Sequence, residues 1–174
     1  WVWRFRNFAV AHAVPLGTRC ANLVPVRSWR YALISAFDAV ACWVLATLLC
    51  AERTLPTDQI TRYPRRPKLA RFTFSIFAFP EQRYPDVLRQ YRRFCADHYA
   101  EHGYRPALLT IGYRVGQSRH ALFSYSWECD VMTIDPVAFG GPEWDRFVDC
   151  FNEFCIARGG KPLMNQRPRL TAAH

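Results

Sequence analysis

The segment from Arg71 to Asn165 alternates strand-like and helix-like stretches, and this order limits the fold more than any other feature of the chain. Side chains of a strand point to alternate faces, so apolar residues at every second position indicate one buried face. This alternation predicts strands at 71–79, 107–115 and 121–127, with a short strand at 162–165. We expect helices to cover the apolar face and the Thr, Ser, Gly and Arg side chains to form an open polar face.

Two amphipathic helices are expected between these strands. Apolar residues recur at helical spacing over 84–102 and 142–158. Pro85 and Pro142 suit a first helical turn, where a missing N–H costs no hydrogen bond, and Gly103 suits a helix end. The order of elements predicts an α+β fold, with an antiparallel sheet and helices on one face as in ferredoxin-like domains.

A further helix is expected at 29–52 and is apolar on almost every side. Ser28 would cap it, and Asp38 is the only charged residue between Arg30 and Glu52. The length is close to that of a membrane span, but Asp38 near the middle would cost about 3 kcal/mol on insertion. Two alternatives stay open: a helix buried against a partner domain, and a helix associated with a membrane.

Composition divides the chain into three parts. Residues 1–28 have the character of a fragment of a preceding segment, and 29–70 comprise the apolar helix and a linker rich in Pro and Arg. Residues 71–174 form the α+β domain. Because the chain starts at Trp1 without Met, we expect it to be part of a longer or processed protein.

Arginine accounts for nearly all of the formal net charge of +9. Such a charge favours nucleic acid, a membrane surface or an anionic ligand as partner. The arginines are scattered and form no basic helix with interleaved aromatics, so we expect no nucleic-acid binding. Seven cysteines, an odd number with no CxxC pair, favour a reducing, cytoplasmic location over a disulfide framework.

The predicted open sheet face supplies the candidate binding residues. Arg114 is the best placed, because a strand holds a side chain more firmly than a loop does. Ser124 and Ser126 would alternate onto the same face. Lys161 follows a Gly-Gly pair and would contact an anion, while Asn165 and Gln166 would either orient a ligand or satisfy their turn.

The sequence contains little evidence for a metal site or for a nucleophilic catalytic residue. His98 and His102 stand at i and i+4, a spacing that can chelate a metal, but no third ligand is evident and both continue an apolar stripe. We therefore expect no metal site. Cys129 lacks the arrangement of a thiol nucleophile, and the usual phosphate-loop and nucleophile-elbow motifs do not occur.

Four groups of residues in the second half of the chain carry a family resemblance. They are Leu122-Phe-Ser-Tyr-Ser-Trp127, Met132-Thr-Ile-Asp-Pro136, Trp144 with Phe147 and Phe151-Asn-Glu-Phe154, and Arg158-Gly-Gly-Lys-Pro-Leu-Met-Asn-Gln166. Together they resemble the cap domain of FAD-linked oxidases in the vanillyl-alcohol oxidase-like group, which includes aldonolactone oxidases. The similarity covers about 72–173.

The resemblance implies the substrate-binding cap of an FAD-dependent oxidoreductase, whose sheet lies over the flavin. It implies catalytic roles for Arg114 and Tyr113, substrate contacts from Ser124, Ser126, Asn165 and Gln166, and cofactor contacts from Arg114 and Lys161. Gly112 stands where some relatives carry a Glu. The implied partners are a small-molecule substrate and a flavin-binding domain, which is absent from this chain. The alternative is a noncatalytic, membrane-associated binding module that uses the 29–52 helix.

Overall fold

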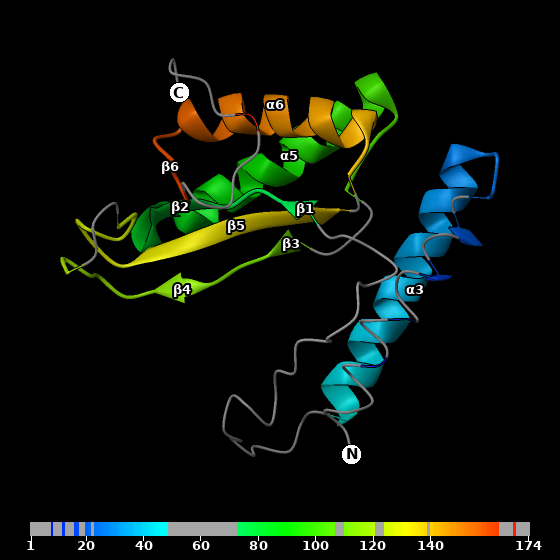
Figure 1. Cartoon of the computed structure of the whole chain (residues 1–174), viewed down its shortest axis with the longest axis horizontal. Coiled ribbons are helices and arrows are strands. Elements are labelled where there is room, and N and C mark those ends of the chain that lie inside the picture. The colour runs from blue at the N-terminus through cyan, green and yellow to red at the C-terminus, as the bar shows by residue number, and fades with distance from the viewer. Residues whose placement is uncertain are drawn as a thin grey trace. The chain divides into compact units, whose positions relative to one another are not determined.

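The structure is a computed structural model that describes residues 8, 12, 16–17, 20–21, 23–48, 73–106, 110–120, 124–138, 140–163 and 169. The chain divides into two compact units, Trp1–Arg71 and Phe72–His174. The first contains helix α3 (Arg27–Leu48), and the second contains the sheet and two further helices (Figure 1).

The second unit is built around strand β5 (Val131–Ala138), which pairs with neighbours on both edges. On one edge lie β1 (Thr73–Phe74) and β2 (Phe77–Pro80), and β6 (Lys161–Pro162) extends the sheet beyond β2. On the other edge lie β3 (Thr110–Ile111) and β4 (Arg114–Val115). All pairs are antiparallel, so the predicted α+β class with an antiparallel sheet is confirmed.

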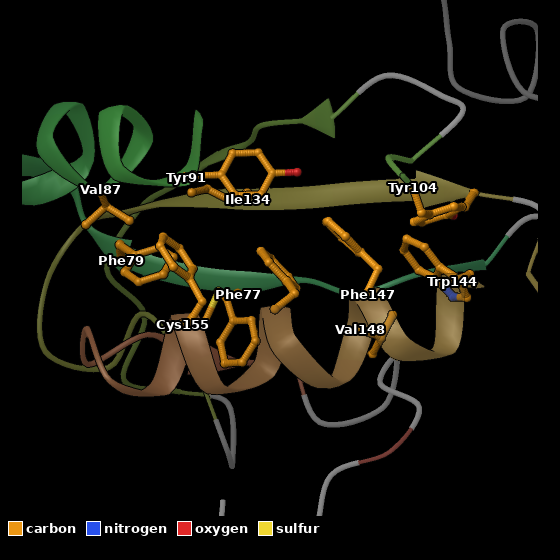
Figure 2. Close-up of a cluster of buried hydrophobic side chains, with 13 residues drawn as sticks. Phe77, Phe79, Val87, Tyr91, Tyr104, Ile134, Trp144, Phe147, Val148 and Cys155 are labelled. Atoms are coloured by element: carbon orange, nitrogen blue, oxygen red, sulfur yellow. The ribbon is translucent and has the colours of Figure 1, made fainter. Parts of the chain in front are cut away.

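Helices α5 (Tyr84–His102) and α6 (Pro142–Ile156) lie together on one face of this sheet (Figure 1). A short 3-10 turn, η2 (Glu81–Arg83), joins β2 to α5. Both helices are confirmed, and Gly103 ends α5 at φ 63, a left-handed conformation that glycine adopts without strain. The side chains between sheet and helices form a mostly aromatic core (Figure 2), which includes Phe77, Phe79, Tyr91, Ile134, Trp144, Phe147 and Phe151.

Strand β5 is absent from the sequence prediction, which instead placed a strand at 121–127. That prediction is wrong over the described residues 124–127, which have no strand conformation. Pro136 explains the omission, because proline has no N–H for a central strand. The structure accommodates it by a gap between β1 and β2: Ser75 lies opposite Pro136, and its N–H donates to the Pro136 carbonyl at 3.4 Å.

The prediction of which sheet residues face the helices is also wrong. Residues paired directly across two strands share a face. Arg114 pairs with Met132, which in turn pairs with Phe79 of the core, so Arg114 lies on the face that α5 and α6 cover. Thr110 lies there too, with its hydroxyl 3.0 Å from the Tyr91 hydroxyl of α5. We call this the helix face.

The opposite face, which we call the distal face, carries Ile76, Ala78, Ile111, Thr133 and Asp135. The pairs Ala78 with Thr133 and Ile111 with Asp135 fix this assignment. Alternation could not decide it from sequence, because residues 76–79 are apolar at every position and are buried on both faces. Strand β2 therefore contains no polar side chain that would show which of its two faces is turned away from the helices.

Helix α3 carries a stripe of exposed apolar side chains. Trp29, Leu33, Val40 and Trp43 are exposed and fall within about 80° of the helix circumference at 3.6 residues per turn. The sequence predicted a helix at 29–52, of which 49–52 lie outside the described residues. Among the helices that the structure describes, none is both long and apolar enough to cross a membrane.

Candidate functional site

Arg114 is held by two carboxylates at the end of the sheet. Its guanidinium donates to both Glu81 oxygens at 2.9 and 3.1 Å and to Asp130 Oδ2 at 2.7 Å. Hydrogen bonding to Glu81, together with the charges of Glu81 and Asp130, raises the pKa of Arg114. The guanidinium therefore already neutralises acids of its own chain, where the sequence predicted an arginine facing a ligand.

The other predicted site residues are scattered, and most bond locally. Ser124 and Ser126 bond to each other, with their hydroxyl oxygens 3.1 Å apart, and Lys161 pairs with Glu128 at 2.9 Å. Tyr113 is half exposed, and its backbone N–H donates to the Thr133 hydroxyl at 2.9 Å. The predicted residues Asn165 and Gln166 lie outside the described residues.

Asp135 on β5 is a buried acid that sequence reasoning did not single out. Its cross-strand partner on the distal face is Ile111, and Ile76 follows on the opposite edge. Asp135 is 4% exposed, and Oδ1 has no hydrogen-bond partner among the residues that the structure describes. Burial raises the pKa of Asp135 to about 6. A buried carboxyl with a pKa near neutrality is a candidate for proton transfer.

A second group of chemistry-bearing side chains lies between α5 and α6. His98 and His102 of α5 and Cys150 of α6 each offer a ligand atom, and these atoms lie within 4.8 Å of one another. The three line an open groove of about 600 Å³. At one end of the groove Arg158 ties the helices together, since its Nε donates to Gln90 Oε1 of α5 at 2.6 Å.

The surroundings of this group set its protonation. Burial lowers the pKa of His98, which favours the neutral imidazole. Burial raises the pKa of the Cys150 thiol, and the nearby charges of Glu153 and Asp149 raise it further. The arrangement is thus a neutral His98 imidazole, the His102 ring and a protonated Cys150 thiol around a shared space.

The sequence contained part of the signal for each group. The i, i+4 spacing of the histidines was visible, but Cys150 joins them only because α6 packs against α5. Pro136, the residue next to Asp135, is unfavourable in a strand, so the sequence does not predict that the segment around Asp135 belongs to the sheet. Comparison with protein-family models, with curated proteins and with solved structures finds no match to this chain.

Proposed function

We propose that the second unit is the substrate-binding part of an FAD-dependent oxidoreductase, with Asp135 as the proton acceptor. The observation that carries the proposal is the buried carboxyl of Asp135, whose Oδ1 lacks a partner among the described residues. The family resemblance of segments 122–127, 132–136 and 144–166 supports the same class. The small-molecule substrate would be one that loses a proton as it is oxidised, such as an alcohol.

The distal face is buried at Ile76, Ala78 and Thr133, but it has exposed surface along the edge next to this carboxyl. Ile111, directly across from Asp135, is 39% exposed, and Tyr113 on the same strand edge is 50% exposed. Both described sheet-covering helices lie on the other face (Figure 1). An aromatic and an aliphatic side chain next to an acid suit a ligand with an apolar body and a hydroxyl group.

The chain's own contribution would be orientation and proton transfer. When bound, FAD supplies the hydride acceptor. The Asp135 carboxylate would take the hydroxyl proton of the substrate as its C–H bond gives up the hydride. A base with a pKa of about 6 is mostly ionised at neutral pH and still accepts a proton readily. Tyr113 would keep the role at the site that the resemblance implies. Arg114 would act only indirectly, by holding Glu81 and Asp130 in position.

The test is a visible spectrum of the natural protein that contains this chain, followed by reduction with candidate alcohols under anaerobic conditions. We expect a flavin spectrum that bleaches with substrate. Asp135→Asn should keep the flavin but slow its reduction by at least about 100-fold, the usual contribution of a general base.

Asp97→Asn is the matched control, because Asp97 is exposed on α5 and lies away from the distal face. It should reduce at the rate of the unaltered protein. A colourless protein, or an Asp135→Asn variant that reduces as fast as the control, would contradict the proposal.

A second candidate function rests on the exposed stripe of α3. Trp29, Leu33, Val40 and Trp43 lie on one side, and the partly exposed Asp38 lies on the opposite side of the helix. This pattern suits a helix lying in the surface of a membrane, with tryptophans at the polar boundary.

The chain should co-sediment with anionic lipid vesicles. The double variant with Trp29→Ala and Trp43→Ala should no longer co-sediment, whereas Trp127→Ala should co-sediment as the unaltered chain does. Equal sedimentation of all variants would contradict this function.

A further inference from the structure

We propose that His98, His102 and Cys150 bind a zinc ion in the groove between α5 and α6. The site is independent of the proposed oxidoreductase function, because its three ligands lie on the helices and not on the distal face. It reverses the expectation of no metal site. The first observation is convergence: one ligand atom from each residue lies within 4.8 Å of the other two.

The second observation is the state of His98. The residue is 4% exposed, and Nδ1 lies 3.1 Å from the Tyr104 carbonyl oxygen. A carbonyl can only accept, so Nδ1 carries the proton and Nε2 holds a lone pair. Nε2 is buried and has no hydrogen-bond partner among the described residues. Metal-bound histidines are held in this way, with one nitrogen donating to a carbonyl and the other left for the metal.

The neighbouring rings hold the ligands in place. The His98 ring packs edge-on against Phe147 of α6 at 5.1 Å and against His102 at 4.6 Å between centroids. Phe147 is fully buried, so it fixes α6, and with it Cys150, next to the histidines. The site is therefore built on two packed helices, which position ligands more precisely than loops do.

The distances and ligand types favour zinc. Tetrahedral zinc with ligand bonds of about 2.0–2.3 Å would hold its ligand atoms about 3.3–3.6 Å apart. A closing movement of about 1 Å would reach that geometry from the present spacing, within the reach of side-chain rotation. Two imidazoles and one thiolate are a set that zinc accepts, and harder cations such as Mg²⁺ prefer oxygen ligands. Binding would release the thiol proton of Cys150.

Three protein ligands leave one tetrahedral position for an exchangeable ligand. The three residues line the open groove of about 600 Å³, and Cys150 and His102 are only partly buried. Solvent therefore reaches the fourth position, where zinc would carry a water molecule. A closed structural site would instead need a fourth side chain, and no fourth Cys, His, Asp or Glu joins the cluster among the described residues.

The test uses the purified full chain after treatment with a chelator, titrated with Co²⁺ and then with Zn²⁺. We expect one equivalent of Co²⁺ to give intense visible bands and a thiolate charge-transfer band, and Zn²⁺ to displace it. Cys150→Ser should remove the charge-transfer band, and His102→Gln should weaken zinc binding by at least about 100-fold, since even loss of a supporting contact costs 10- to 100-fold.

Matched controls are Cys95→Ser and His120→Gln. Cys95 lies on α5 outside the cluster, and His120 is exposed in a loop, so both variants should bind as the unaltered chain does. Circular dichroism without metal checks that Cys150→Ser and His102→Gln remain folded. Failure of the folded, unaltered chain to bind, or retention of the charge-transfer band in Cys150→Ser, would overturn the proposal.

Discussion

Asp135→Asn is expected to stabilise the second unit at about pH 8, by at most about 3 kcal/mol, an unusual result for a change in a buried strand. The carboxyl has a pKa of about 6 in the folded chain, against a usual value of 3.8. Each pKa unit corresponds to about 1.4 kcal/mol, so ionising this group in the fold costs at most about 3 kcal/mol. Asparagine has nearly the same shape and carries no charge.

The sign of the pH dependence follows from the same shift. Between about pH 4 and pH 6 the folded chain holds a proton that the unfolded chain has lost. The stability of the unaltered protein is therefore complete below about pH 4 and falls as the pH rises through about 6. In the Asn variant this component disappears, so the two proteins differ most in mildly alkaline solution.

Urea unfolding, followed by near-ultraviolet circular dichroism across this range, measures the effect. Asp97→Asn, an exposed change on α5, should alter the free energy of unfolding by less than about 0.5 kcal/mol. If Asp135→Asn were destabilising at alkaline pH, an unrecognised cation would have to partner this carboxyl. Functional residues often lower the stability of the fold that holds them. A destabilising carboxylate at position 135 would therefore support the proposed role of Asp135 as a base.

The sequence predicted the helices better than the sheet, for physical reasons. Helices α5 and α6 have long apolar stripes with Pro at the start of each and Gly103 at the end of α5, so local signals agree. The strands other than β5 span only two to four residues, too short to show alternation. The central strand contains Asp135 and Pro136, residues that strands usually avoid.

The candidate sites depended on tertiary contacts that no spacing encodes. Arg114 was correctly placed on a strand, but its pairing with Glu81 and Asp130 required the ends of three segments to meet. Cys150 stands far along the chain from His98 and joins it only through helix packing. Residue types that can act as ligands are evident from the sequence, but only the folded structure shows which of them lie close together.

Phe151→Ala is expected to give the largest loss of stability, about 3–5 kcal/mol, the usual cost of removing a buried phenylalanine ring. Phe151 is fully buried on α6. Its ring lies 5.6 Å from Phe77 of the sheet and 5.7 Å from Tyr91 of α5, between centroids. The ring therefore connects α6 with both the sheet and α5, and its removal would leave a cavity that no single element can close.

Urea unfolding measures this loss, with Trp127→Ala as the control, because Trp127 is 49% exposed and its removal should change stability by less than about 0.5 kcal/mol. Phe151→Leu should recover more than half of the loss, since leucine refills most of the volume. Phe151 also follows Cys150 directly, so loosening α6 should weaken zinc binding in Phe151→Ala but not in Trp127→Ala. A loss of less than about 1 kcal/mol would mean that α6 is held to the sheet by contacts other than this aromatic cluster.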